Sequence, residues 1–424
     1  MIESSLAWFK ELSNTLQNIG FKQTDSDPCV FHSYANGDRT SILVYVDDLM
    51  VFARDRQRTI EIREQLTEKY QQLTIKDYEE TDELNYLNIQ IRRIVDDSNH
   101  VTAFELHQNT YCNKIIDELG LRDTPNSFES TALPYTTDLF TVDGNSPPLN
   151  KVDAKWYASA VGKILYTSSK IRIALALPAS FLCKRMQHPT EQDMAKLLRV
   201  LHWIKEHPDG GITIQRGDIN DMNLYVWADP SDNCHFDAKG HTGVYISIGK
   251  DSGSPVFYMP KVQSLVSRSS TEAELIAVYQ SIPHALWAME ALTEWGYIQD
   301  YMTVFQDNIS SIISSIDGTK PYSKTGHINR RIFNSREYLL AGVIKMPHCS
   351  THDMLADPLT KPLSPGIALP HIKKMVGINT PDVEDNMPDD DMELEESEEI
   401  NEADIVSQIQ VYMFMLNLHL YDEV

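Results

Sequence analysis

The order of apolar runs between residues 222 and 363 most constrains what this chain can fold into. Short runs bounded by turn residues predict strands at 224–229, 243–248, 256–259, 303–306 and 343–346. Apolar residues every three or four positions predict helices at 271–295, 310–316 and 328–340, with a short helix after Ser350. Pro283 predicts a kink in the long helix and Gly296 its end. This order predicts a mixed sheet of five strands with helices on its faces.

The residues upstream of this unit also alternate helical and strand-like patterns. The apolar runs 42–45 and 49–52 flank Val46, Asp47 and Asp48, which predicts a β-hairpin with an acidic tip. Residues 126–150 are rich in Thr, Pro, Asn and Ser, which is typical of a linker. Similar patterns predict strands at 86–94 and 102–106, and helices at 6–20, 56–70, 108–120, 157–186 and 191–207.

The net charge of −24 argues against a nucleic-acid binder only until the charges are located. Fifteen acidic residues lie between Asp382 and Glu423, where there is no Lys or Arg, so a charge of −9 remains for the rest of the chain. A weakly acidic body can carry a basic groove, and carboxylates at a metal site add negative charge themselves. The acidic tail, residues 377–424, is predicted to be disordered.

Composition also narrows the cellular setting. Five scattered cysteines without a Cys-x-x-Cys pair indicate a reduced, intracellular protein. No apolar run approaches about 18 residues and the first residues do not resemble a signal peptide, so neither secretion nor a membrane span is expected. His348, Cys349 and His352 have the residue types of a zinc site, but no second pair at finger spacing accompanies them.

Four acidic residues stand at boundaries of the predicted elements in the second half of the chain. Asp229 and Asp307 end strands, Glu274 lies in the first turn of the long helix, and Asp357 opens the last helix. Strand ends and helix starts at one edge of a sheet converge, so these carboxylates are expected to share a cleft. Clustered carboxylates stay ionised together only around cations, and oxygen ligands select Mg²⁺ or Mn²⁺. Two such ions would support hydrolysis of a phosphodiester in a nucleic-acid strand.

Each of these acids also has a purely structural interpretation. Thr271 and Glu274 fit a helix capping box, and Asp307 before Asn308 fits a helix N-cap or a turn. Asp357 before Pro358 is an ordinary helix start, and Asp229 before Pro230 fits a turn. Each structural interpretation is the better one for its residue alone, but four acids in series within one α/β unit favour a metal site.

The motifs that contain these acids resemble the ribonuclease H region of Ty1/copia-type retrotransposon polyproteins. The motifs are Trp227-Ala-Asp229, Ser269-Ser-Thr-Glu-Ala-Glu-Leu-Ile-Ala277, Asp307-Asn308, Lys324-x-x-His327-Ile328 with Arg336-Glu337, and Ala356-Asp-Pro-Leu-Thr-Lys-Pro-Leu363. The resemblance implies an RNase H fold that cuts the RNA strand of an RNA/DNA hybrid. It also implies catalytic and metal-binding roles for Asp229, Glu274, Asp307 and Asp357, with two Mg²⁺ or Mn²⁺ ions. A DDE integrase is disfavoured, because its acidic series ends in Glu.

The first half resembles the C-terminal part of a copia-type reverse transcriptase palm. Leu6-Ala-Trp-Phe-Lys-Glu-Leu12, Asp27-Pro-Cys-Val-Phe31 and Tyr45-Val-Asp47-Asp48 carry this resemblance, and Asn88 stands where the family usually has Gly. An Asp-Asp pair on a tight hairpin could hold Mg²⁺ against nucleotide phosphates, although a polar hairpin tip also takes Asp freely. In the family a third carboxylate and the fingers precede the segment with which this chain begins. RNA-directed DNA polymerase activity is therefore expected only if those parts are supplied.

Together the patterns and resemblances define the predicted organisation. The fold class is α/β (α+β), with a truncated reverse transcriptase palm and thumb at 1–125, a linker and helical connection at 126–215, and an RNase H-like domain at 222–365. The expected partners are RNA/DNA hybrid, single-stranded RNA or DNA template, and a full-length element protein, with no membrane, in a cytoplasmic particle or the nucleus.

Residues expected to bind nucleic acid are Lys324, His327, Arg330, Arg331 and Arg336, for which a solvated helix face is the alternative. A non-catalytic remnant that only binds nucleic acid is the competing functional hypothesis.

Overall fold

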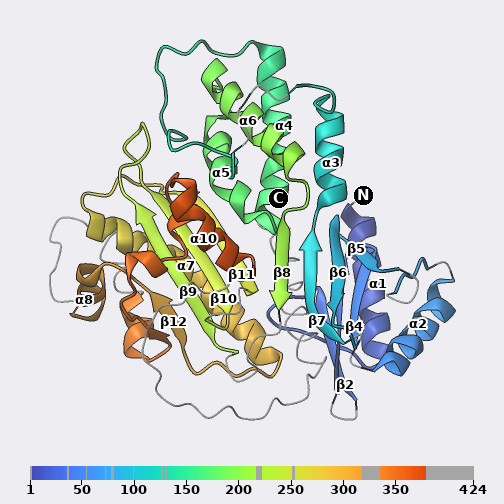
Figure 1. Ribbon diagram of the computed structural model, residues 1–424. Coiled ribbons are helices and arrows are strands. Elements are labelled where there is room, and N and C mark those ends of the chain that lie inside the picture. The colour runs from blue at the N-terminus through green and yellow to red at the C-terminus, as the bar shows by residue number, and fades with distance from the viewer. Residues whose placement is uncertain are drawn as a thin grey trace.

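The computed structural model contains three β-sheets, with helices packed against them (Figure 1). The structure describes residues 2–35, 38–53, 55–71, 73–77, 81–98, 100–125, 128, 131–215, 222–250, 254–317 and 335–378. Most of the acidic tail, the first half of the helix predicted at 328–340, and the basic residues between 324 and 331 lie outside this part of the chain. The mixed α/β class predicted from the sequence is confirmed.

The strands form two sheets of four and one sheet of five. The first sheet has the order β1-β2-β3-β4, with β1 (Lys22–Gln23), β2 (Val30–Ala35), β3 (Asp38–Tyr45) and β4 (Asp48–Ala53). The second has the order β5-β6-β7-β8, with β5 (Glu83–Tyr86), β6 (Ile89–Val95), β7 (Val101–His107) and β8 (Gly211–Gln215). The third has the order β11-β10-β9-β12-β13, with β9 (Leu224–Ser231), β10 (His241–Ile248), β11 (Ser254–Val262), β12 (Met302–Phe305) and β13 (Ile344–Lys345).

Helices connect the strands and cover the sheets. Those of the first half are α1 (Ile2–Asn18), α2 (Arg56–Tyr70), α3 (Asn109–Glu118), α4 (Lys151–Lys170), the 3₁₀ turn η1 (Ile173–Leu175), α5 (Ala176–Arg185) and α6 (Glu191–Glu206). Those of the second half are α7 (Ser270–Glu294), α8 (Ile309–Asp317), the 3₁₀ turns η3 (Thr351–Asp353) and η4 (Asp357–Leu359), and α10 (Pro365–Met375). Pro283 does not interrupt α7, and α10 was not predicted from the sequence.

The third sheet has the mixed topology that the apolar runs predicted. Strands β9, β10 and β11 form an antiparallel meander, while β12 runs parallel to β9 and β13 runs parallel to β12. The parallel pairs require crossover connections, and α7 and α8 supply them. Every residue of β10 is buried, as expected for a strand with neighbours on both sides and packing on both faces.

The first sheet is an antiparallel meander covered on both faces. Ile42 and Val44 pack with α1 and α2, whereas Leu43, which points to the opposite face, joins the main core of the molecule. The predicted hairpin of β3 and β4 is therefore confirmed, with Asp47 and Asp48 at its tip. Its register is fixed because a shift by one residue would exchange the two buried faces.

The strand predicted at 86–94 is instead a hairpin of β5 and β6. Tyr86 pairs with Ile89 across a two-residue turn, and the turn residues Leu87 and Asn88 both have positive φ angles, of 54° and 59°. A tight hairpin requires this backbone, and Asn tolerates it better than most residues other than Gly. Asn88 thus supplies the positive φ angle that this turn requires, in place of the Gly that the resemblance led us to expect.

The helix predicted at 157–186 is in fact two helices that pack against each other. The chain leaves the helical conformation after α4, and Pro178 lies in the first turn of α5, where its missing N–H is tolerated. The hydroxyl of Tyr157 in α4 donates to the carbonyl of Leu182 in α5 at 3.0 Å. The proline was the sequence signal for this break.

Arg172, at the break, ties the helices to the second sheet. Its buried guanidinium donates to the carbonyls of His207, Pro208 and Gly210 at 2.6 to 3.0 Å. These carbonyls lie between the end of α6 and the start of β8, which pairs with β7. A strand from the predicted helical connection therefore completes the sheet formed by the preceding part of the chain.

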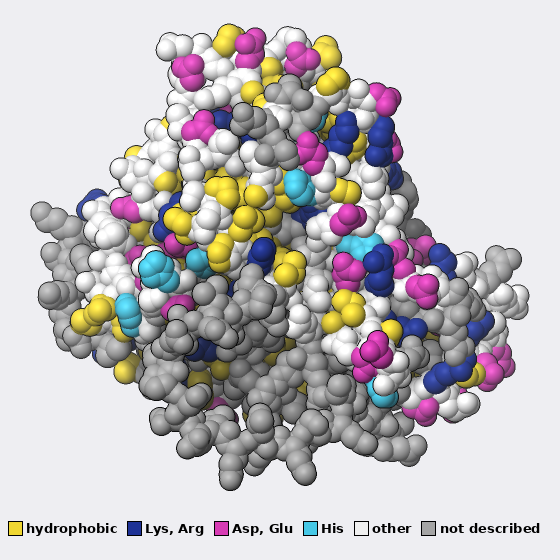
Figure 2. All heavy atoms as spheres, viewed as in Figure 1, with side chains coloured by type: hydrophobic (Ala, Val, Ile, Leu, Met, Phe, Trp, Pro, Cys, Tyr) yellow, Lys and Arg dark blue, Asp and Glu magenta, His cyan; other side chains and the backbone are white. Residues whose placement is uncertain are grey.

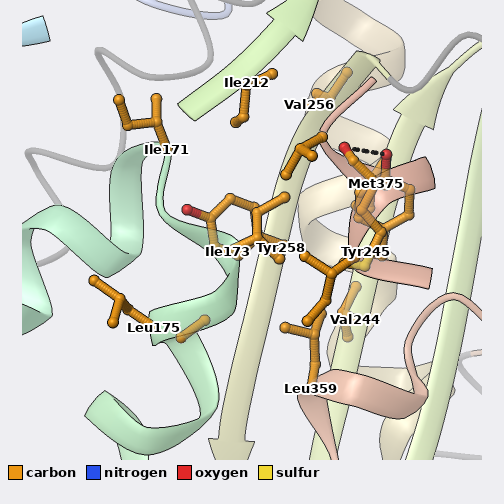
Figure 3. Packing of buried hydrophobic residues seen from close by; sticks show 14 of the residues in the cluster. Ile171, Ile173, Leu175, Ile212, Val244, Tyr245, Val256, Tyr258, Leu359 and Met375 are labelled. Atoms are coloured by element: carbon orange, nitrogen blue, oxygen red, sulfur yellow. Dashed lines mark hydrogen bonds between the residues drawn. The ribbon is translucent and has the colours of Figure 1, made fainter. Parts of the chain in front are cut away.

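One apolar core joins the second and third sheets. Figure 3 shows Ile173 and Ile212 on one side of this core and Val256, Tyr258 and Tyr245 on the other. The Tyr245 hydroxyl donates to the carbonyl of Met375 at 3.2 Å, which anchors the end of α10 in the same region. In the part of the chain that the structure describes, no helix combines the length and apolarity that crossing a membrane requires.

A second contact joins the third sheet to the first. The carboxylate of Glu294, at the end of α7, accepts hydrogen bonds from the backbone N–H groups of Asp25 and Ser26 at 2.7 and 3.1 Å. The indole of Trp287 donates to the carbonyl of Ser26 at 3.2 Å. The guanidinium of Arg39 in β3 lies 4.9 Å from the ring centroid of Trp295. This contact fixes α7 against the turn before β2.

We expect Glu294→Ala to lower the free energy of unfolding by about 1–3 kcal/mol, because two backbone donors and the Ser26 hydroxyl lose a charged acceptor. Urea unfolding followed by circular dichroism measures this change. Glu290→Ala, at an exposed position of the same helix, is the matched control and is expected to change stability by less than about 0.5 kcal/mol. Equal effects of the two substitutions would contradict a role for the Glu294 contact.

Candidate active site

Three of the four predicted acids converge at one edge of the third sheet. Asp229 lies in β9, Glu274 in the second turn of α7, and Asp307 directly beyond the end of β12. One carboxylate oxygen from each lies within 4.8 Å of the others. Asp229 and Glu274 are buried, with exposed fractions of 3% and 7%, and Asp307 is half-buried. Residues separated by up to 78 positions thus form one acidic cluster, which we call the acidic triad.

Neighbouring residues take the structural roles that the sequence left open for these acids. Ser269 is the N-cap of α7, and Glu272 reaches back to the backbone N–H of Arg268 at 2.9 Å, so the capping box does not use Glu274. At the start of α8 the side chain of Asn308 accepts from the backbone N–H of Ser311 at 3.1 Å. Asp229 lies inside a strand and not in a turn. Capping therefore does not explain the positions of the triad.

Two buried glutamines hold the elements that carry the triad. The amide of Gln263 donates to the hydroxyl of Thr242 in β10 at 3.1 Å and to the carbonyl of Ala273 in α7 at 3.2 Å. The amide of Gln306 donates to the carbonyl of Ala228, next to Asp229, at 2.5 Å, and accepts from Ser311 at 3.1 Å. Sequence analysis missed both residues, because a single amide side chain carries no motif.

Asp357, the fourth predicted acid, lies beside the triad but is paired differently. Its carboxylate forms a 2.8 Å ion pair with the ammonium group of Lys361. Thr360, between them, donates its hydroxyl to Asp229 at 3.1 Å and to the carbonyl of Asp357 at 2.9 Å. The segment from Asp357 to Lys361 therefore contacts the acidic triad through Thr360.

Gly243 allows this segment to approach the sheet. It pairs with Asp229 across β9 and β10, and a Cβ atom at this position would lie 2.6 Å from Thr360 and 2.7 Å from the carbonyl oxygen of Ala356. A side chain here would push η4 away from the strand that carries Asp229. The glycine is thus required by close packing and not by its φ angle.

Burial and mutual repulsion dominate the electrostatics of the cluster. Burial, with the charges of Asp229 and Asp307, raises the pKa of Glu274 to about 9. Burial and the charge of Asp357 raise the pKa of Asp229 well above its usual range. Burial lowers the pKa of Lys361, but its hydrogen bond to Asp357 and the surrounding carboxylates outweigh this and raise it. The cluster attracts cations strongly.

The donor set fits a hard divalent cation. Among the described residues, the buried Oε2 atom of Glu274 has no hydrogen-bond partner, although such an atom normally has one. Carboxylate oxygens are the ligands that Mg²⁺ and Mn²⁺ prefer. The zinc alternative gains no support, because within the described residues the group with metal-site geometry is the acidic triad and does not include His348, Cys349 or His352.

The predicted Asp47 and Asp48 lie in a different part of the molecule, at the exposed tip of the β3–β4 hairpin. Val46 begins the two-residue turn with a φ angle of 55°, the sign that a type II′ turn requires. Burial and the charge of Asp47 raise the pKa of Asp48. Asp48 lines a cleft of about 690 Å³, together with Tyr45, Lys76, Asn85, Leu87, Asn88, Tyr111 and Tyr166.

Of the residues predicted to bind nucleic acid, the structure describes Arg336. It lies half-buried in a helical turn at 335–340. Lys324, His327, Arg330 and Arg331 lie outside the described residues. On the face shown in Figure 2, the described Lys and Arg side chains are interspersed with Asp and Glu.

We expect Gly243→Ala to destabilise the protein by about 1–3 kcal/mol, because the added methyl group overlaps backbone at Ala356. Thermal unfolding measures this loss. Gly162→Ala in α4, where a Cβ atom meets no neighbour within 4 Å, is the control and is expected to stabilise the helix slightly. The packing argument fails if the two variants unfold at the same temperature.

We expect Glu274→Gln to raise the unfolding temperature of the metal-free protein near pH 8. The folded state raises the pKa of Glu274 from 4.5 to about 9, so it binds this proton more tightly than the unfolded state does. Below about pH 4.5 Glu274 is protonated in both the folded and the unfolded state, so the folded protein keeps its full stability. As the pH rises toward 9, the folded protein loses stability. The glutamine variant lacks this loss, so its advantage should shrink toward pH 5. Melting curves in chelator across this range test the trend, and a pH-independent difference would refute it.

Comparisons with known proteins match a family model, curated proteins and solved structures. The family described as reverse transcriptase (RNA-dependent DNA polymerase) matches residues 1–132. The Pol polyprotein from transposon RE1 of Arabidopsis thaliana is 29% identical over 369 residues, which are 84% of this chain and 23% of that protein. The polyprotein from transposon TNT 1-94 of Nicotiana tabacum is 23% identical, over 88% of this chain and 27% of that protein. The chain thus spans about a quarter of these relatives.

Solved structures with some likeness include RNase H1 of Halobacterium salinarum, with 18% identity over 35% of this chain and 98% of that one, at a TM-score of 0.24. The prototype foamy virus protease-reverse transcriptase has 11% identity over 85% of this chain and 61% of that one, at a TM-score of 0.22. The architecture itself rests on the strand order described above. The sequence relatives confirm the predicted resemblance: the chain is similar to the Pol polyproteins of retrotransposons, and its first third matches the reverse transcriptase family.

Proposed function

We propose that this chain hydrolyses the RNA strand of RNA/DNA hybrids at the acidic triad. The observation that carries the proposal is the convergence of Asp229, Glu274 and Asp307, whose carboxylate oxygens lie within 4.8 Å of one another. Repulsion between buried carboxylates is costly, and divalent cations offset it. The mixed five-stranded sheet that carries the triad is the one that the resemblance to ribonuclease H implied.

The triad, with Asp357 beside Asp229, would hold two Mg²⁺ or Mn²⁺ ions. When bound, such ions supply an activated water on one side of a phosphodiester and charge stabilisation for the leaving oxygen on the other. The chain's own residues fix the carboxylates: Thr360 orients Asp229, and Thr351 donates to Asp307 at 3.2 Å. Rigid placement of this kind preserves the geometry that the reaction needs.

The proposed substrate and partners follow from the same chemistry. The hybrid would reach the triad from the edge of the sheet where β9 and β12 end, and the proposed phosphate contacts are Lys324, His327, Arg330, Arg331 and Arg336. We also propose that Asp47 and Asp48 serve RNA-directed DNA synthesis on single-stranded template. A full-length element protein is the proposed partner in this synthesis.

A non-catalytic remnant that binds nucleic acid remains the competing hypothesis. It predicts binding of RNA/DNA hybrid without cleavage, and an affinity whose salt dependence does not change when the triad is altered. The intact triad and the orphaned Oε2 atom of Glu274 favour the enzyme.

We expect Asp307→Asn to lower the Mg²⁺-dependent cleavage of an RNA/DNA hybrid by about a hundredfold or more, because it removes a charge worth several kcal/mol at a metal site. Gel analysis of a labelled RNA strand, with and without EDTA, measures the rate. Asp300→Asn, at an exposed position before β12, is the matched control and should leave the rate unchanged. A folded wild-type protein that binds hybrid and never cuts it would establish the competing hypothesis.

A further inference from the structure

Lys361 places a positive charge beside the acidic triad, next to Asp357. Its ammonium group lies 2.8 Å from the Oδ1 atom of Asp357, four residues earlier in the chain. The side chain of Asp357 is 5% exposed, whereas that of Lys361 is 37% exposed, so the lysine reaches the buried carboxylate from the solvent side. Its charge also acts on Asp229 and Glu274.

The negative charges of the three triad carboxylates and of Asp357 are therefore offset in two different ways. The carboxylate oxygens of Asp229, Glu274 and Asp307 form a group with metal-site geometry, on which Lys361 acts without an ion pair in the part of the chain that the structure describes. Asp357 lies outside this group and already has a cationic partner. Thr360 contacts both sides, since its hydroxyl donates to Asp229 and to the carbonyl of Asp357. The triad therefore has the geometry of a metal site, whereas the charge of Asp357 is offset by an ammonium group.

We propose that Lys361 acts as a built-in competitor for the second divalent ion, so that the ion held by the triad binds tightly and the ion beside Asp357 binds only when the lysine withdraws. The inference rests on the proposed function and deepens it, because it assigns different affinities to the two ions. Lys361 is a positioning residue in this scheme, and it acts through Asp357.

The side chain of Lys361 suits this role. Its flexible four-carbon stem and compact ammonium group can leave Asp357 without any movement of the backbone. The carboxylate of Asp357 is buried and needs a cationic partner, and a divalent ion can take the place of the ammonium group that reaches it from the solvent side. A site that is free for only a fraction of the time shows an apparent affinity reduced by that fraction. Removal of the lysine should therefore strengthen the weaker ion site selectively.

A purely structural role makes a different prediction. The backbone N–H of Lys361 donates to the carbonyl of Asp357 at 3.3 Å, so this segment is a closed turn that the ion pair could simply stabilise. In that case, loss of the lysine would lower the unfolding temperature and leave ion affinities unchanged. Ion binding must therefore be measured directly, and not through activity alone.

The experiment measures Mn²⁺ binding to the full chain by electron paramagnetic resonance of the free ion. We expect a tight and a weak class of site in the wild type, and we expect Lys361→Met to tighten the weak class by about threefold to tenfold. Lys361→Arg retains the charge and should stay within twofold of the wild type. Lys261→Met, at an exposed position of β11, is the matched control. If Lys361→Met does not fold, Lys361→Gln replaces it with the same expectation.

Two results would overturn the inference, and they differ in what else they affect. If Lys361→Met leaves the weak class within twofold of the wild type, or if Lys361→Arg behaves like Lys361→Met, the competition is refuted and the proposed function stands. If the wild type binds no more Mn²⁺ than Asp307→Asn does, the acidic triad is not a metal site. The proposed function and the inference then fail together.

Discussion

Repulsion between buried carboxylates is the constraint on which the active-site region depends. Asp229 and Glu274 are removed from water and face each other and Asp307, which raises the pKa of Glu274 to about 9. A fold retains such an arrangement only if the surrounding structure outweighs its cost. Here the support comes from the amides of Gln263 and Gln306, which fix α7 and β12 against the meander. The repulsion between these carboxylates lowers the stability of the folded chain, and the same negative charge attracts cations to the acidic triad.

Two contacts between the sheets fix the position of the hairpin tip with Asp47 and Asp48 relative to the acidic triad. Glu294 ties the end of α7 to the turn before β2, and α7 also carries Glu274. Arg172 ties the break between α4 and α5 to the connection before β8, and β8 packs against the third sheet through the shared core. The hairpin tip with Asp47 and Asp48 and the acidic triad thus belong to one connected framework. A relative spacing fixed in this way would suit two sites that act on the same nucleic-acid duplex.

Local sequence patterns predicted most elements because the physical causes were local. The helix at 56–70 and the five strands of the third sheet follow from apolar periodicity and turn residues, and the structure confirms them. The patterns failed where two local signals conflicted. An apolar run hid the break before Pro178, and the tight turn at Leu87 and Asn88 carried no Gly to reveal it. Strand β8 was missed because its pairing with β7 bridges about a hundred residues of chain.

The sequence by itself identified the candidate residues: the four acids, their motif order and the family that they resemble were all readable without coordinates. Only the tertiary structure decided how those acids are partnered. Glu272, and not Glu274, serves the capping box of α7, while packing of β9, α7 and β12 brings Asp229, Glu274 and Asp307 together and leaves Asp357 paired with Lys361. The physical reason is that motif and capping preferences are short-range. The balance of charge in a buried cluster, in contrast, is set by groups that meet only when distant strands and helices pack together.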